Sequence, residues 1–147
     1  MIIFRTAAVA VAAILATTLS ACSASATRGV TIEMNELPVA TTLAAGLPET
    51  LVFSDRMGAA AVALVPGPVD VDGYATLSSY ESGDVAYRAA EQTLFVFLSD
   101  GAAEPGDGLI LIGRTADGVA GLSSCSQDCS VRVSARHAEV SEQHDER

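Results

Sequence analysis

Between Gly83 and Leu98, two runs of apolar residues flank a polar turn. This arrangement predicts a β-hairpin. The second run puts apolar side chains on both faces of an extended strand, with Phe95 and Phe97 on one face and Leu94, Val96 and Leu98 on the other. Because both faces then have to be covered, we expect this run to be the central strand of the fold.

Shorter patterns of the same kind predict the other strands. In Val30–Met34, apolar residues alternate with polar ones, which is typical of a half-buried strand. Further strands are expected at Leu51–Phe53, Ala59–Leu64, Leu109–Ile112 and Val131–Ala135. The segment Val65–Ser82 is rich in turn-forming residues, so it is predicted to be a long loop with little regular structure.

One helix is predicted after the first strand. Asn35 is the expected N-cap, Pro38 is tolerated in the first turn, and Gly46 and Pro48 are expected to end the helix. Its apolar stripe is expected to cover one face of the central strand. Several short strands with a single helix indicate a mainly β fold, namely a small closed or half-closed barrel with one covering helix across an opening.

The first 21 residues have the pattern of a secretory signal peptide. Arg5 precedes an apolar run, Ala7–Ala16, that is shorter than the roughly 20 residues needed to span a bilayer. The run leads into Leu19-Ser20-Ala21-Cys22, which resembles a bacterial lipobox. That resemblance implies cleavage before Cys22 and attachment of lipid to its thiol. The alternative is an ordinary signal peptide with a Cys near its cleavage site by chance.

These features divide the chain into a signal peptide (1–21), a small polar tether (22–29), one domain (30–135) and a polar tail (136–147). A lipid anchor with two or more acyl chains is expected to hold the domain permanently at the extracytoplasmic face of a bacterial cell membrane. The formal net charge is −10, and every basic residue apart from His is Arg. Nucleic acid is not expected as a partner, because binding to its phosphates requires a basic surface.

Four segments, in this order, resemble the small bacterial cyclophilin-like domain family: residues 34–40 with 47–48, residues 51–55, residues 83–87 with 93–98, and residues 109–114 with 121–122. The resemblance implies a compact β-barrel related to the cyclophilins, usually without a defined activity. The family commonly begins with an extra strand before the segment equivalent to Thr31–Met34. The tether occupies that place here, so either the barrel lacks an edge strand or residues 23–29 supply a poor substitute.

Proline isomerases of the cyclophilin type use an Arg in a pocket that includes a His and usually a Trp. This chain has no Trp, and its two His residues, His137 and His144, lie beyond the matched segments. By residue type alone, Arg56, Arg88 and Arg114 are candidates for the isomerase Arg. The alternative for each is an Arg at the surface or rim, paired with a carboxylate.

This incomplete set of catalytic residues favours a non-catalytic domain that binds an unknown small molecule or peptide. We expect its pocket to be lined by Tyr87, Phe95 and Arg114. The leading hypothesis is therefore a lipid-anchored, extracytoplasmic binding module. The first alternative is a weak peptidyl-prolyl cis-trans isomerase acting on exported proteins, and a thiol-based redox protein is a third possibility.

Cys125 and Cys129 are predicted to form a structural disulfide, because two nearby Cys residues outside the cytoplasm usually pair. The alternative is two free thiols. A zinc site would need further ligands that no other Cys and no His of the domain provides, so no metal or cofactor is expected. The segment 70–73 has the beginning of a calcium loop but lacks its later acidic positions, and it is interpreted as a turn.

Overall fold

The computed structural model describes residues 28–125 and 127–137. Its elements are β1 (Arg28–Met34), α1 (Pro38–Ala45), β2 (Glu49–Arg56), β3 (Ala60–Leu64), β4 (Ser79–Tyr80), β5 (Asp84–Arg88), the 3₁₀ helix η1 (Ala89–Glu91), β6 (Thr93–Phe97), β7 (Gly101–Ala102), β8 (Leu109–Thr115), α2 (Ala120–Ser123) and β9 (Cys129–His137). None of the helices in these ranges combines the length and apolarity needed to cross a membrane.

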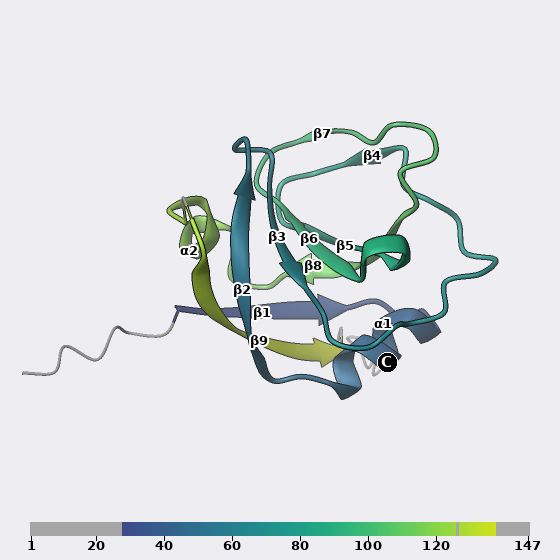
Figure 1. Ribbon diagram of the computed structural model, residues 1–147, viewed down its shortest axis with the longest axis horizontal. Coiled ribbons are helices and arrows are strands. Elements are labelled where there is room, and N and C mark those ends of the chain that lie inside the picture. The colour runs from purple at the N-terminus through teal and green to yellow at the C-terminus, as the bar shows by residue number, and fades with distance from the viewer. Residues whose placement is uncertain (1–27, 126, 138–147) are drawn as a thin grey trace, which may run out of the picture.

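Seven strands close into a barrel in the order β1-β8-β5-β6-β3-β2-β9 (Figure 1). The barrel closes where β9 pairs with β1 in parallel, from Arg28↔Val131 to Met34↔His137. The other neighbours in the barrel are antiparallel. The remaining strands, β4 and β7, form a separate two-stranded ribbon. The prediction of a mainly β fold with a small barrel is confirmed, and the barrel is fully closed.

The predicted hairpin is confirmed as β5 and β6, joined through η1. β6 lies between β5 and β3, and all five of its residues are buried. Leu94 and Val96 point into the barrel, whereas Phe95 and Phe97 belong to a second apolar cluster on the outside of the wall. β6 is thus a strand covered on both faces, as its sequence pattern indicates.

The main core fills the barrel and is closed at one end by α1. Alternate residues of the strands point inward, among them Ile32 of β1 and Phe53 of β2, both fully buried. α1 lies across the barrel end and packs against β1, β8 and β9 (Figure 1). Its buried residues Val39, Ala40 and Leu43 join the barrel core. The helix therefore covers an opening of the barrel, which confirms that part of the prediction, but it does not pack on one face of β6, as was also predicted.

The start of the helix also differs from the prediction. Leu37 is the N-cap residue, and Pro38 begins the first turn, where the missing N–H costs no hydrogen bond. The side chain of Asn35 instead donates from Nδ2 to the carbonyl of Leu111 at 2.7 Å and accepts the N–H of Leu37 at 3.1 Å. Asn35 thus ties the chain to β8 before the helix begins.

The β4–β7 ribbon covers the outer aromatic cluster. The ring of Tyr80 in β4 stacks on Phe97 with 3.7 Å between the ring centroids, and Phe97 lies 6.2 Å from Phe95. Leu77 and Ala103, which flank the ribbon, pack against the same cluster. The predicted loop Val65–Ser82 therefore contains one short strand. A strand of two residues is too short to produce a recognisable alternation in the sequence.

β1 and β9 are longer than predicted. Arg28 and Gly29, assigned to the tether, are the first residues of β1 and pair with β9. β9 starts at Cys129 and continues to His137, so it includes the first two residues of the predicted tail. Because β1 itself closes the barrel against β9, the barrel lacks no edge strand. The residues assigned to the tether supply part of that closure, from Arg28 onward.

Candidate functional site

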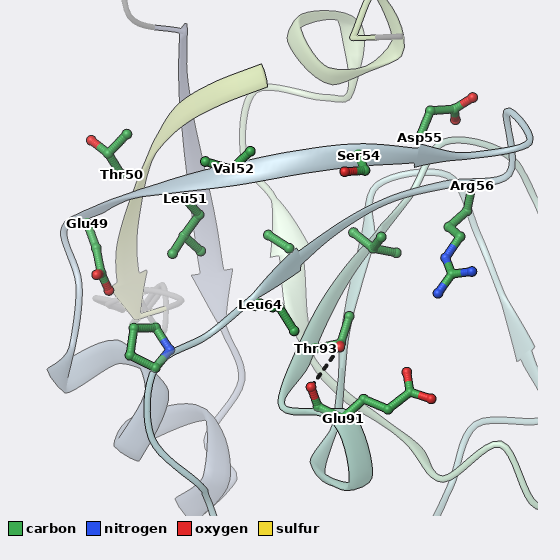
Figure 2. Close-up of a pocket in the computed structure, with 13 residues that line it drawn as sticks. Glu49, Thr50, Leu51, Val52, Ser54, Asp55, Arg56, Leu64, Glu91 and Thr93 are labelled. Atoms are coloured by element: carbon green, nitrogen blue, oxygen red, sulfur yellow. Dashed lines mark hydrogen bonds between the residues drawn. The ribbon is translucent and has the colours of Figure 1, made fainter. Parts of the chain in front are cut away.

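An open cleft of about 810 Å³ lies in the barrel wall between β2 and β3. Figure 2 shows the two strands joined at their turn and spreading apart toward Glu49 and Leu64. The residues that line it come mainly from β2, β3 and the region where η1 meets β6. A volume of this size falls within the range of roughly 300 to 1,000 Å³ that is common for ligand sites.

The cleft forms because β2 and β3 pair along only part of their length. Four register pairs join them, from Arg56↔Ala60 at the turn to Phe53↔Ala63. Beyond this point β2 continues to pair with β9 as far as Glu49, while β3 stays with β6 through Leu64. The two strands therefore follow different neighbours, and the wall opens between them.

The sequence after β3 explains why the ladder stops. Val65 donates its N–H to the carbonyl of Gln92 at 2.8 Å, which holds the chain beside η1 and β6. The next residue, Pro66, has no N–H and cannot extend a ladder toward β2. Pro66 also lines the cleft. The opening is thus built into the local sequence rather than left by a missing element.

Apolar side chains stand on the two walls of the cleft, and charged ones mark its ends. Val52 on β2 is 53% exposed and Leu64 on β3 is 72% exposed. Glu49 lies where the strands are far apart and Arg56 where they meet (Figure 2). Within the described residues, no hydrogen bond or ion pair engages the side chain of Glu49 or Arg56. The cleft can therefore contact an apolar ligand and still offer a carboxylate and a guanidinium to it.

The three residues of the predicted pocket do not come together. Tyr87 is fully buried inside the barrel, whereas Phe95 belongs to the cluster on the outside of the wall. Arg114 has a half-exposed side chain near the end of β8. Since the wall of the barrel separates Tyr87 from Phe95, a pocket lined by all three residues does not form, and this prediction is wrong in its geometry.

Two of the three candidate Arg residues are held in structural contacts. Arg114 contacts Asp84 from Nε at 3.1 Å and Glu81 from Nη2 at 3.2 Å, and the Asp84 side chain is only 12% exposed. Arg88 pairs with Glu91, and its guanidinium carbon lies 4.8 Å from the centre of the Phe95 ring. Both therefore match the alternative of an Arg paired with a carboxylate. Arg56 is the candidate that lines the cleft.

Cys125 and Cys129 lie within disulfide-bonding distance, with their Cα atoms 5.8 Å apart. Cys125 is buried in the barrel core next to Leu122 of α2, and Cys129 begins β9. Nη1 of Arg28 lies 3.2 Å from Sγ of Cys129. The pair therefore connects the end of α2 to the first residue of β9, and neither Cys lines the cleft between β2 and β3.

Several predicted features lie outside the described residues. These are the signal peptide, the lipidation residue Cys22, and His144 in the tail. His137 is described and is the last residue of β9. Within the described ranges, no group of three or more His, Cys, Asp and Glu side chains is close enough to hold a metal ion.

The cleft itself was not predicted from the sequence. Leu51 and Phe53 point into the core whether or not β2 pairs with β3. The alternation of apolar and polar residues along β2 therefore does not indicate which strand pairs with it. Pro66, two residues after the end of β3, was the one local signal, because a proline cannot continue a ladder.

A model of the cyclophilin-like family matches residues 25–134 of this chain. This range starts three residues before β1 and ends within β9, so it contains the other six strands of the barrel entirely and β9 up to residue 134. No curated protein and no solved structure matches the chain.

Proposed function

This chain belongs to the cyclophilin-like family, and on that premise we propose that it is a lipid-anchored binding protein whose ligand occupies the cleft between β2 and β3. The proposal rests on one observation, namely the cleft itself. It exposes Val52 and Leu64 in a closed barrel whose other large apolar side chains, apart from Met57 at the hairpin turn, are mostly covered. Exposed apolar surface in a concave site commonly marks a binding site.

The groups around the cleft support binding rather than catalysis. They comprise carboxylates, hydroxyl groups and the guanidinium of Arg56, and the described lining residues include no aromatic side chain, His or Cys. A general acid or base that works near neutral pH is most often a His, and a covalent mechanism needs an activated nucleophile. A fixed apolar surface with charges at its ends is sufficient to hold and orient a ligand.

The location rests on the N-terminal sequence. Arg5, the apolar run Ala7–Ala16 and the motif Leu19-Ser20-Ala21-Cys22 favour export and lipid attachment at Cys22. Arg28, the first residue of β1, comes six positions after Cys22, and an extended chain of that length reaches only about 20 Å. The barrel would then remain close to the outer surface of a bacterial cell membrane.

The binding site is tested by photo-cross-linking from within the cleft. A benzophenone amino acid at position 64 is expected to cross-link a ligand in the cell envelope, and the same group at the exposed position 104, in the loop before β8, is the control. Mass spectrometry then identifies the attached molecule. Equal yields of the same adducts from both positions would contradict a ligand site in the cleft.

The anchor is tested separately. The intact mass of protein from the membrane fraction should lack residues 1–21 and carry acyl chains. Cys22→Ser is expected to release the protein or leave it unprocessed. An unmodified wild-type protein in the culture medium would show that the chain is not a lipoprotein.

A second candidate function is weak peptidyl-prolyl isomerisation, favoured by the position of Arg56. Its side chain lines the cleft without an ion-pair partner among the described residues. A protease-coupled assay with a proline peptide decides between the functions. Turnover that disappears in Arg56→Ala, but persists in the matched variant Arg132→Ala on the exposed face of β9, would establish catalysis and replace the binding proposal.

A further inference from the structure

The register of β2 leaves part of a strand edge open inside a closed barrel. Residues 49–52 of β2 pair with β9 on one side, and no residue of β3 pairs with them on the other. The N–H and C=O groups of successive residues in a strand point alternately to its two sides. About half of the groups in residues 49–52 are therefore directed toward the cleft rather than toward β9.

The opposite wall offers far less to a hydrogen-bonding ligand. β3 ends at Leu64, which pairs with Thr93 of β6. The N–H of Val65 is already bonded to the carbonyl of Gln92, and Pro66 has no N–H. A strand that enters the cleft can thus form a regular ladder with β2 but not with β3.

The side chains around this edge select the chemistry of the added strand. Val52 and Leu64 give it apolar contacts on the two walls, and Glu49 places a carboxylate at the wide end. A basic side chain of the ligand would therefore lie near Glu49, away from the guanidinium of Arg56 at the narrow end (Figure 2). The formal charge of −10 for the whole chain further favours basic over acidic ligands.

The chain's own C-terminal segment fits this edge poorly. Residues 138–147 contain four acidic residues against one Arg. Repulsion from Glu49 and from the net charge of the barrel disfavours that segment as the occupant. A partner of opposite charge fits the same surface better.

We infer that the cleft binds an extended peptide, rich in apolar residues and carrying at least one basic side chain, which pairs as an added strand with residues 49–52 of β2. This inference rests on the proposed binding function and deepens it by naming the ligand class. In such a complex, main-chain hydrogen bonds supply affinity and the flanking side chains supply specificity. Recognition through the strand edge does not require proline in the ligand.

The test uses two N-methylated isomers of one peptide. The probe is a fluorescently labelled hexapeptide of alternating Val and Arg with blocked ends, titrated against the full chain in detergent. In one isomer the Val amides are methylated, and in the other the Arg amides are methylated. An extended peptide directs these two sets of amides to opposite edges, so a single paired edge distinguishes the isomers.

We expect the unmethylated peptide to bind saturably, one isomer to bind at least about tenfold more weakly, and the other to stay within about threefold. If the two isomers bind with equal affinity, whether both keep the affinity of the parent peptide or both lose it, then the peptide does not pair through a single edge and the inference is overturned. An absence of saturable binding by the parent peptide also overturns the inference. The photo-cross-link at position 64 still decides independently whether the cleft binds any ligand.

Two charge variants control for attraction to an acidic protein in general. Glu49→Gln is expected to weaken binding of the peptide about threefold, as is usual for an exposed ion pair. Glu104→Gln removes the same charge from the loop before β8, outside the cleft, and is expected to change the affinity less than about 1.5-fold. An equal effect of both variants would show that net charge, and not the cleft, attracts the peptide.

Discussion

Val52 and Leu64 occupy the next positions after the last pair of the β2–β3 ladder, yet they lie on separate walls of the cleft. The last pair is Phe53↔Ala63. Val52 pairs instead with Ser130 of β9, and Leu64 pairs with Thr93 of β6. Both apolar side chains remain exposed as a result. A departure from complete pairing that leaves apolar surface in water is typical of a functional position.

A disulfide between these positions is expected to close the cleft. In Val52→Cys/Leu64→Cys, oxidation would continue the ladder by one pair and enclose about 12 residues, which stabilises the fold by about 3 kcal/mol at most. Binding of the Val-Arg peptide should be lost on oxidation and restored by dithiothreitol. The wild-type protein with and without the reductant is the control. An oxidised variant, verified by mass, that binds as well as the wild type would contradict the location of the site.

The central strand was predictable because its evidence is local. Apolar side chains at every position from Leu94 to Phe97 require cover on both faces, whatever the rest of the chain does. The closure of the barrel depends instead on β9 returning to β1. The parallel pairing of β9 with β1 joins residues about 100 positions apart. The alternation of apolar and polar residues in either strand does not specify the other strand as its partner.

The failure of the predicted pocket has a simple geometric reason. Tyr87 pairs across the hairpin with Leu94, so these two side chains share the inner face of the wall. Phe95 follows Leu94 directly and must point to the other face. Counting alternate positions outward from the turn is therefore sufficient to place Tyr87 and Phe95 on opposite faces of the hairpin.

The close approach of β1 and β8 depends on Gly113. A Cβ atom at this position would collide with the backbone carbonyl of Glu33, so Gly113→Ala is expected to destabilise the barrel by at least about 2 kcal/mol. Gly29→Ala is the matched control on β1, because its Cβ would meet nothing closer than the carbonyl oxygen of Arg132 at 3.9 Å. Urea denaturation of the two variants measures the difference. Equal free energies of unfolding for the two variants would show that β1 and β8 can move apart at position 113 without a loss of stability.

The hydroxyl group of Tyr87 is expected to contribute little to the stability of the fold. It is buried and has no hydrogen-bond partner within the described residues. Tyr87→Phe removes this unpaired group and is expected to leave the free energy of unfolding unchanged or to raise it by about 1 kcal/mol. Tyr87→Ala should lower it by about 3–5 kcal/mol, because the ring fills the barrel core. A loss of more than about 1 kcal/mol in Tyr87→Phe would mean that the hydroxyl is bonded in solution.

The bond between Cys125 and Cys129 is expected to order one corner of the barrel rather than hold the whole fold together. It encloses a very short loop, since the two residues are four positions apart, and a loop of this size gives about 2 kcal/mol at most. Cys125→Ala combined with Cys129→Ser should therefore lower the free energy of unfolding by no more than about 2 kcal/mol and leave the circular dichroism spectrum in place. Alanine suits position 125 because that side chain is buried in the core.

The local effect of this bond should appear where β9 begins. Hydrogen exchange is expected to accelerate in the first residues of β9, whose neighbours are Arg28 of β1 and Phe53 of β2. Exchange in β6 should stay slow, because that strand is covered on both faces by other parts of the fold. Alkylation of both Cys residues in the unreduced native protein would show that the bond does not form. If the double variant fails to fold, then the bond between Cys125 and Cys129 stabilises the whole barrel and not only the beginning of β9.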